Sequence, residues 1–290
     1  MGKFILNVDT GVDDALAIIL MAKYGLNPEF IVAASGNSTI ENTYNNTRGV
    51  VSLLGLNIPV YRGSFRPLAR EPYMEDFHGE RGISGYKFKK FSPGSEKNGI
   101  IKMYEALKND KFTIISTSPL TSLGILLSLD PSIYSQINEI IIMGGAFRLN
   151  SFGNGNMGDA EFNVFYDPEA AKIVFNSGIK LRAIPLDITM NPDFAITAKD
   201  MKNSPNDSPC SDFTKAVISD MIKRHGKFEL HDPIAAFSYI KPEAFNYING
   251  DIIVDGSGKT RIMEKISSSM VAVSLNKELF NSGIKEKLLH

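Results

Sequence analysis

The sequence predicts an α/β protein with a doubly wound, mostly parallel sheet that is flanked by helices. Three observations predict this fold class. Short apolar runs rich in Ile and Val lack period-two alternation, which is typical of parallel strands covered on both faces. Helical patterns separate these runs, which indicates βαβ units. Hydrophobic residues make up 43% of the 290 residues, enough for a sizeable core, and we expect residues 1–290 to form a single domain.

The predicted strands and helices alternate along most of the chain. The strands are expected at residues 4–8, 30–34, 112–116, 139–143 and 181–186. The helices are expected at residues 13–24, 40–54, 99–109, 121–128, 168–177 and near 212–224. Ligands of open parallel sheets bind beyond the carboxyl ends of the strands, so the loops there are candidates for the functional site.

Three segments are rich in Gly, Pro or polar residues and are expected to lack regular structure. Segments 62–98 and 147–160 are long for simple connections, which favours binding loops or lids. Segment 202–209 is predicted to be a linker that leads into the helix near 212–224.

Charge and cysteine content exclude several classes of function. Lys and Arg together number 31 and Asp and Glu 32, so no overall positive field would hold DNA or RNA. Cys210 is the single cysteine and cannot form an intramolecular disulfide, and no Cys/His cluster has the spacing of a zinc site. No apolar run reaches the length of a membrane span, and the first residues run into the acidic cluster by Asp9, which leaves no room for the apolar region of a signal peptide. We therefore expect a cytoplasmic protein with neither a nucleic-acid nor a membrane partner.

An acidic cluster follows the first predicted strand. Asp9, Asp13 and Asp14 lie within eight residues of Asn7, at the strand end and the opening of the next helix. A helix cap explains one or two of these acids, Asp13 or Asp14, but three converging carboxylates need a counter-charge. Calcium takes about six to eight oxygen ligands, and the absence of a nearby His or Cys disfavours zinc. The segment therefore indicates a site for a hard cation.

Short motifs flank the other predicted strands, and each is a weak signal alone. In chain order they are Ser35-Gly36-Asn37, Ser118-Pro119-Leu120-Thr121, Met143-Gly144-Gly145, Ala160-Glu161-Phe162-Asn163, Asp167-Pro168-Glu169-Ala170-Ala171, Pro185-Leu186-Asp187 and Leu230-His231-Asp232-Pro233. With the acidic segment, they resemble in type and order the motifs of the inosine-uridine nucleoside hydrolase family. The resemblance covers most of the chain. It implies an enzyme of nucleoside salvage that hydrolyses the N-glycosidic bond of ribonucleosides.

The resemblance also implies a metal site and a mechanism. Ca²⁺ would be held by Asp9, Asp14, Asp232 and the backbone carbonyl of Thr117, and Asp9 would be the general base that activates a metal-bound water. Attack by water implies inversion through an oxocarbenium-like transition state. Family members commonly form dimers or tetramers, so a homodimer or homotetramer is expected. Asn7 departs from the family pattern, which usually has Asp at that position.

Ribose contacts follow from the same resemblance. Asp13 is expected to bind the 2'-hydroxyl. Glu161 and Asn163 would share one face of an extended segment and bind the 5'- and 3'-hydroxyls, their alternative being a solvated loop or a helix cap. Asn37 is expected to bind either ribose or Asp9. Further expected substrate contacts are Met143 and a loop asparagine, Asn156 or alternatively Asn154.

Two histidines are candidates for the base-binding end of the pocket. His231 adjoins Asp232 and is expected to protonate the leaving base, its alternative being a structural role. His78 resembles the His-Gly of the family's base-side loop, its alternative being an exposed loop histidine. His225 and His290 are interpreted as surface residues.

Base preference is predicted from the aromatic residues. The chain has no Trp, so Phe147, Phe152, Phe165 or tyrosines are the candidates for stacking on a base. Pyrimidine or broad preference is ranked above purine specificity. Two other functions stay open: a phosphate-dependent nucleoside phosphorylase, which needs cationic groups for phosphate, and a non-catalytic nucleoside binder.

Overall fold

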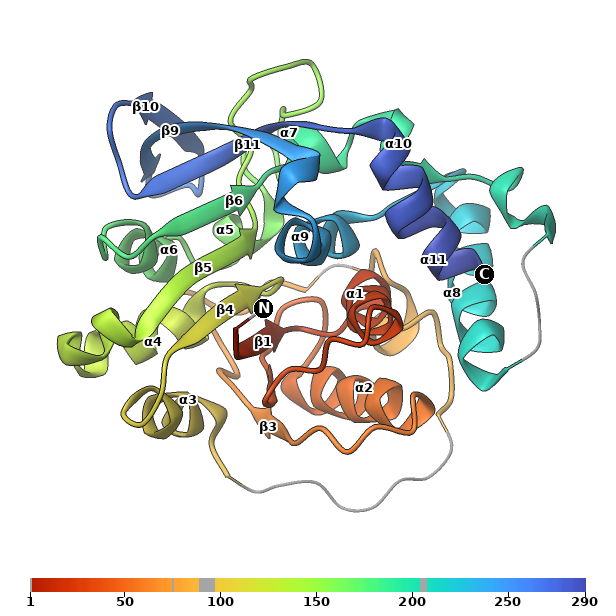
Figure 1. Cartoon of the computed structure of the whole chain (residues 1–290), viewed down its shortest axis with the longest axis horizontal. Coiled ribbons are helices and arrows are strands. Elements are labelled where there is room, and N and C mark those ends of the chain that lie inside the picture. The colour runs from red at the N-terminus through yellow and green to blue at the C-terminus, as the bar shows by residue number, and fades with distance from the viewer. Residues whose placement is uncertain (1, 75, 89–96, 204–207) are drawn as a thin grey trace.

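The computed structural model describes residues 2–74, 76–88, 97–203 and 208–290, and its fold confirms the predicted class. Within the described residues, nine strands form one sheet in the order β10-β9-β11-β6-β5-β4-β1-β2-β3 (Figure 1). Neighbouring strands from β3 to β11 run parallel, whereas β9 and β10 are antiparallel to their neighbours. The strands are β1 Phe4–Val8, β2 Ile31–Ala33, β3 Val60–Arg62, β4 Phe112–Ser116, β5 Ile137–Met143, β6 Leu181–Ile184, β9 Phe245–Val254, β10 Thr260–Glu264 and β11 Ser269–Leu275. A separate antiparallel pair joins β7 Ala195–Ile196 to β8 Phe228–Glu229.

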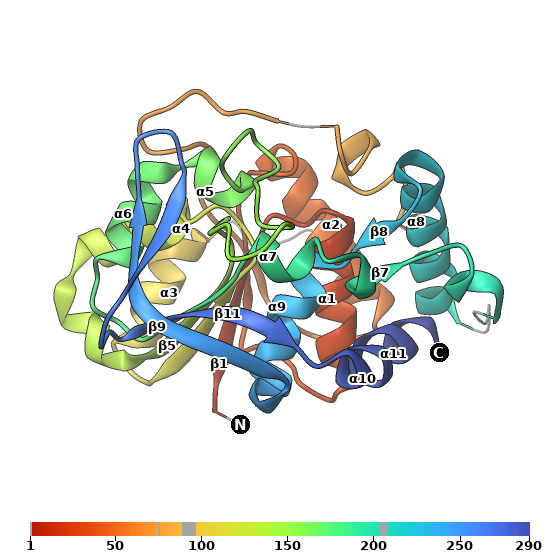
Figure 2. The same cartoon turned by 90° about the horizontal axis from the view of Figure 1, so that it is seen from above.

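Helices cover both faces of the sheet, as Figure 2 shows from above. One face carries α1 Val12–Lys23, α2 Ile40–Leu53, α8 Pro209–His225, α9 His231–Ile240, α10 Lys277–Phe280 and α11 Glu286–Leu289. The other face carries α3 Gly99–Leu107, α4 Thr121–Leu129 and α6 Pro168–Phe175. Two short helices are α5 Phe162–Tyr166 and α7 Leu186–Thr189. Short 3₁₀-helices are η1 Glu80–Gly82, η2 Pro131–Gln136, η3 Pro192–Phe194, η4 Asp200–Asn203 and η5 Pro242–Ala244, and η6 Asn281–Lys285 is a π-helix.

The central strands are apolar on both faces because each face lies under helices. All five residues of β1 are buried. Phe4, Leu6 and Val8 belong to the core on the α1 side, and Ile5 belongs to the core on the α3 side. This two-sided burial explains why the strand sequences lack polar alternation.

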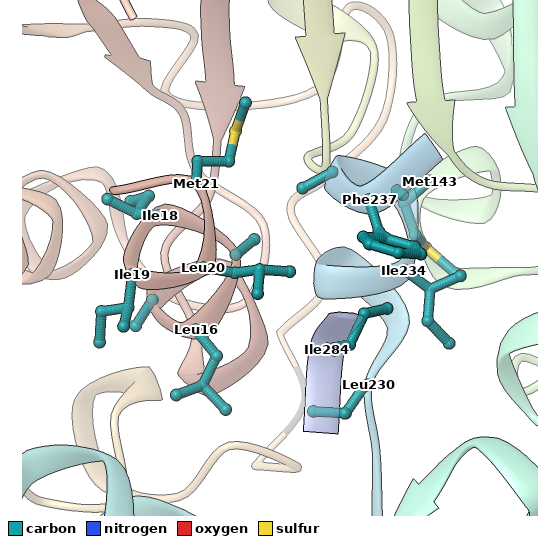
Figure 3. Close-up of a cluster of buried hydrophobic side chains, with 14 of the residues drawn as sticks. Leu16, Ile18, Ile19, Leu20, Met21, Met143, Leu230, Ile234, Phe237 and Ile284 are labelled. Atoms are coloured by element: carbon teal, nitrogen blue, oxygen red, sulfur yellow. The ribbon is translucent and has the colours of Figure 1, made fainter. Parts of the chain in front are cut away.

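Helices α1 and α9 pack against each other on one face of the sheet. Figure 3 shows Leu16 and Leu20 of α1 in the same cluster as Ile234 and Phe237 of α9, and all four side chains are buried. This packing places the first turns of the two helices side by side. Those first turns carry the acidic residues discussed below.

The predicted elements occur with shifted ends. The strand predicted at residues 181–186 is too long, because β6 ends at Ile184 and Leu186 already begins α7. The predicted extended conformation of residues 161–163 is wrong, because Asn163 lies in α5 and Glu161 is its N-cap. The predicted linker 202–209 begins in η4 and ends in α8, and its residues 204–207 lie outside the described ones. Within the predicted loop 62–98, residues 75 and 89–96 also lie outside them. None of the described helices is long and apolar enough to cross a membrane.

Candidate active site

The acidic cluster lies at the point where the chain order of the strands reverses. From β1 the chain continues to β2 and β3 on one side and then crosses to β4 on the other side of β1. Open parallel sheets bind ligands at this position, beyond the carboxyl ends of the strands. Asp9 directly follows β1, and Thr117 directly follows β4. The topology therefore brings both predicted metal-site residues to one edge.

Four buried aspartates meet at this edge: Asp9, Asp13, Asp14 and Asp232. Oxygen atoms of Asp13, Asp14 and Asp232 lie within 4.8 Å of one another. Asp13 and Asp14 are in the first turn of α1, and Asp232 is in the first turn of α9. The partial positive charge at two helix N-termini therefore stabilises acids that would otherwise repel one another.

Asp14 is the most extensively bonded of these acids. Its carboxylate accepts hydrogen bonds from the Thr117 hydroxyl at 2.6 Å, the Gly11 amide at 2.9 Å and the Asn37 side-chain amide at 3.2 Å. Burial, reinforced by the charge of Asp13, nevertheless raises the pKa of Asp14 to about 6. The Gly11 contact shows that the predicted capping role is real, and Asp14 also belongs to the acidic group.

Asp9 has one satisfied and one unsatisfied carboxylate oxygen. Oδ2 accepts a hydrogen bond of 2.7 Å from the Asn37 amide, while Oδ1 is buried without a hydrogen-bond partner among the described residues. A Cβ atom on Gly36 would lie 2.1 Å from Oδ2, so only glycine allows this close approach. Burial and the charge of Asp14 raise the pKa of Asp9 well above its usual range. An unpaired buried carboxylate oxygen beside three further acids fits a cation.

The donor set favours a hard cation but differs in one respect from the implied ligands. Asp14 and Asp232 belong to the tight group of acids, which also includes Asp13, whereas Asp9 lies outside it. The Asn37 backbone amide binds Oδ2 of Asp9, which leaves Oδ1 as the oxygen atom that can bind a metal ion. The carbonyl oxygen of Thr117 accepts a hydrogen bond of 3.0 Å from Asn163 and retains a second lone pair. All these donors are oxygen atoms, as calcium prefers.

Asn7 joins a neutral hydrogen-bond network beneath the cluster. Its side-chain amide donates to the hydroxyls of Ser116 at 2.9 Å and Ser118 at 2.7 Å. The departure from the family pattern therefore replaces a carboxylate with a donor to two neighbouring serines.

A cavity of about 330 Å³ opens next to the acids. Ten predicted site residues line it: Asp13, Asn37, His78, Thr117, Met143, Asn156, Glu161, Asn163, His231 and Asp232. Asn156 is thus favoured over Asn154, which donates to the carbonyl of Ser151 at 2.8 Å. The backbone amide of Asn37 binds Asp9 and its side chain binds Asp14, so its predicted contact with Asp9 is made by the main chain.

Glu161 and Asn163 are fixed by the short helix α5. The Glu161 carboxylate accepts from the amides of Asn163 at 2.8 Å and of Gly145 and Val164 at 3.1 Å each. Burial raises the pKa of Glu161 to about 7 against these donors. Asn163 donates to the carbonyl oxygens of Thr117 at 3.0 Å and Met143 at 3.2 Å. Both side chains are buried, which rejects the alternative of a solvated loop.

The two candidate histidines differ in their hydrogen bonds. His231 Nδ1 lies 2.7 Å from the Thr189 hydroxyl, and Nε2 has no hydrogen-bond partner among the described residues. His78 is 6% exposed, so it is not an exposed loop histidine. Its Nδ1 accepts from the Val12 amide at 3.3 Å, and Nε2 lies 3.6 Å from Asp13. Burial lowers the pKa of both rings, that of His78 to about 4. His231 therefore presents the freer ring nitrogen.

The aromatic residues that line the cavity differ from the predicted phenylalanines. Phe147, Phe152 and Phe165 are not among the described residues that line the cavity, whereas Phe77 and Phe162 are. Phe165 instead packs edge-on against Tyr73. Met190 and Glu229 also line the cavity and were not predicted. Phe77, Phe162 and Glu229 lie next to or close to His78, Glu161 and His231, respectively. Met190 lies close to the motif residue Asp187, and this proximity was the available signal.

Comparison with known proteins gives the same assignment by sequence and by structure. RihB of Escherichia coli (strain SE11), a pyrimidine-specific ribonucleoside hydrolase, is 31% identical over 266 residues, which cover 86% of this chain and 83% of that protein. The plant nucleoside hydrolase PpNRh1 superposes with a TM-score of 0.89 at 26% identity, covering 99% of this chain and 98% of that chain. A purine-preferring ribonucleoside hydrolase from Gardnerella vaginalis superposes with a TM-score of 0.87 at 25% identity and the same coverage.

The family description matches nearly the entire chain, over residues 4–282. This match confirms the resemblance that the motifs predicted, and with the acid-lined cavity it identifies an enzyme that hydrolyses glycosidic bonds. The chain belongs to the inosine-uridine preferring nucleoside hydrolase family.

Proposed function

We propose that the protein hydrolyses the N-glycosidic bond of ribonucleosides, with calcium bound at the acidic cluster, to give free nucleobase and ribose. One observation carries this proposal: Asp13 and Asp232 line a cavity that His231 lines as well, and Asp9, which does not line it, has its buried Oδ1 unpaired among the described residues. A sugar held near the acids would place its base toward the histidine. The cavity of about 330 Å³ lies within the size range of small-molecule sites.

The proposed calcium ligands are Asp9, Asp14, Asp232 and the carbonyl oxygen of Thr117. A calcium ion bound there supplies positive charge that offsets the acids and lowers the pKa of a water molecule. Asp9 is the proposed general base, because no described residue donates a hydrogen bond to Oδ1, so one of its two lone pairs could face calcium and the other could accept a proton. The hydrogen bond from Asn37 to Oδ2 holds the carboxylate in orientation.

Ribose is proposed to lie against the walls formed by α1 and α5. Asp13 would accept from the 2'-hydroxyl, Asn163 would contact the 3'-hydroxyl, and Glu161 would accept from the 5'-hydroxyl. The backbone amides that hold Glu161 and the carbonyls that hold Asn163 fix both side chains before substrate binds. Such fixed positions reduce the entropy cost of orienting the sugar. Asn37, Met143 and Asn156 complete the proposed substrate contacts.

His231 is the proposed proton donor to the leaving base. Thr189 holds Nδ1, so the ring is oriented and Nε2 is available. His78 is less suited because its Nδ1 accepts from the Val12 amide and its pKa is about 4. His78 is instead proposed to bind substrate near Asp13.

Pyrimidine or broad base preference is favoured over purine specificity. The relative RihB is described as pyrimidine-specific, whereas the structural neighbour from Gardnerella vaginalis is described as purine-preferring. This chain has no Trp for stacking on a purine, and the aromatic rings at the cavity are Phe77 and Phe162. A cytoplasmic location and a homodimeric or homotetrameric state stay predictions.

The chemistry of the cavity disfavours a phosphorylase. No Lys or Arg is among the described residues that line it, and its acids would repel phosphate. A non-catalytic binder is disfavoured because Asp9 and His231 are both present.

The test is turnover of uridine, cytidine, inosine and adenosine in phosphate-free buffer, with calcium and after chelation. We expect release of ribose from the two pyrimidine nucleosides at least as fast as from the purines, and loss of activity without calcium. Dependence on added phosphate would indicate a phosphorylase, and binding without turnover a non-catalytic binder. Turnover of purines alone would overturn the base preference, and full activity of a metal-free preparation would overturn the calcium site.

A further inference from the structure

The C-terminal turn of α8 contacts the loop that forms one wall of the cavity. Phe77 and His78 of this loop line the cavity, whereas His225, the last residue of α8, does not line it. The His225 ring stacks on the Phe77 ring with centroids 4.4 Å apart and planes at 22°. His225 Nε2 lies 3.2 Å from the Phe77 carbonyl oxygen. A carbonyl only accepts, so Nε2 carries the hydrogen and donates it.

Arg224 attaches the same loop at a second point. Its guanidinium donates to the carbonyl oxygen of Asp76 and lies 3.5 Å from the Asp76 carboxylate. Gly79 has a φ of +71°, and a Cβ atom there would lie 2.1 Å from the Arg224 guanidinium. The close approach shows that the helix end and residues 76–79 are packed tightly together.

The inner side of Phe77 continues this chain of contacts to the acidic cluster. The Phe77 and His78 rings meet edge to face, with centroids 5.1 Å apart and planes at 84°. His78 in turn accepts from the amide of Val12 and lies 3.6 Å from Asp13. Phe77 therefore lies between an exposed histidine outside the cavity and a buried histidine inside it.

We propose that His225 is a positioning residue for nucleobase binding, which holds Phe77, and through it His78, against the cavity. The inference rests on the proposed function only in taking a nucleoside as the ligand. His225 itself is outside the cavity, so its effect on substrate passes through Phe77. His225 is exposed, as the sequence predicted, and the proposal adds a role for it through Phe77.

The experiment compares His225→Ala and His225→Phe with a matched control, Lys223→Ala. Lys223 is exposed on the same helix turn and has no hydrogen bond or ion pair in the described part of the chain. His225→Ala removes the ring and the donor, while His225→Phe keeps a ring that can stack. For uridine we expect His225→Ala to raise KM and lower kcat/KM by roughly 3- to 10-fold, the scale of one partly exposed ring contact and one hydrogen bond. His225→Phe should recover most of this loss, and Lys223→Ala should match the wild type.

A double-mutant cycle with Phe77→Leu tests whether His225 acts through Phe77. In the Phe77→Leu background, His225→Ala should change kcat/KM by less than about 2-fold, because the coupled partner is gone. Calcium affinity measured by calorimetry should be unchanged in every variant.

An equal loss in both backgrounds, no loss in either, or an equal loss in Lys223→Ala would overturn the proposal. The wild-type assay separates this outcome from failure of the proposed function. If the wild type binds uridine without hydrolysing it, the function is wrong, and the same cycle measured as uridine Kd still decides the role of His225.

Discussion

Replacement of His231 by alanine should slow the hydrolysis of natural nucleosides far more than the hydrolysis of a substrate with a good leaving group. Uracil leaves uridine poorly without a proton, whereas p-nitrophenolate is a stable anion that departs from p-nitrophenyl riboside unaided. His231 Nε2 is the ring nitrogen available to give that proton, because Nδ1 is held by Thr189. We therefore expect His231→Ala to lower kcat for uridine by roughly 10²–10⁴-fold, and kcat for p-nitrophenyl riboside only slightly.

The Thr189 contact gives a second, smaller magnitude. Thr189→Val keeps the side-chain shape and removes the 2.7 Å hydrogen bond to Nδ1. A neutral hydrogen bond contributes about 0.5–1.5 kcal/mol, which corresponds to roughly a 2- to 12-fold change in rate. The Thr189→Val variant should therefore hydrolyse uridine much faster than the His231→Ala variant does. It should hydrolyse p-nitrophenyl riboside as fast as the wild type.

The assay is steady-state kinetics on both substrates at saturating calcium, with calcium affinity measured for each variant. If His231 only holds Asp232 in place, both substrates should lose activity alike and calcium affinity should fall with them. That result would refute the proton-donor role and leave the hydrolase assignment intact. Normal hydrolysis of uridine by His231→Ala would transfer the role to another group, with His78 the next to replace.

Three further predictions concern the acids. Asp9→Asn should lower kcat for uridine by about 10²-fold or more while the protein stays folded by circular dichroism, and near-normal turnover would place the general base elsewhere. Chelation should lower the Tm. Calcium at a thousandfold excess over its Kd adds about 4 kcal/mol to the free energy of unfolding, which corresponds to roughly 10 °C in Tm for a chain of this size. An unchanged Tm in differential scanning calorimetry would argue against a metal that binds the folded state. Glu161→Gln should lower the free energy of unfolding by about 1–3 kcal/mol, because an amide nitrogen cannot accept from Gly145 or Asn163. The same substitution should also reduce the ratio of kcat/KM for uridine to kcat/KM for 5'-deoxyuridine. An unchanged ratio would show that Glu161 does not contact the 5'-hydroxyl.

The central strands were predictable because burial on both faces leaves a continuous apolar run. β1 and β4 are of this kind, and their predicted ends agree with the structure. The antiparallel strands β9 and β11 at the other end of the sheet mix buried and partly exposed residues, so their runs are interrupted by polar side chains. The pairing of β11 with β6 and of β9 with β11 depends on tertiary contacts that no local pattern records.

The acid site was predictable for a different reason: its residues are adjacent in sequence or belong to recognisable motifs. The helical conformation that follows Glu161 was not predicted, because capping of α5 by the Glu161 carboxylate ends the extended chain at Glu161, two residues earlier than expected. The cavity contacts of Phe77, Met190 and Glu229 come from three separate segments. Proximity to the motif residues His78, Asp187 and His231 was the available sequence signal, and only the assembled fold shows that the three side chains line one cavity.

The charge balance of the site explains why losing one acid at Asn7 is compatible with a metal centre. Four buried aspartates exceed the charge of one divalent ion, so the remaining negative charge must be offset by the protein. The first turns of α1 and α9 and the donors on Asp14 supply that offset. A fifth carboxylate at position 7 would add a further buried charge, whereas neutral Asn7 donates its amide hydrogens to Ser116 and Ser118 and leaves only its Oδ1 without a partner among the described residues. The neutral residue therefore lowers the repulsion among the acids without removing an oxygen from the proposed ligand set.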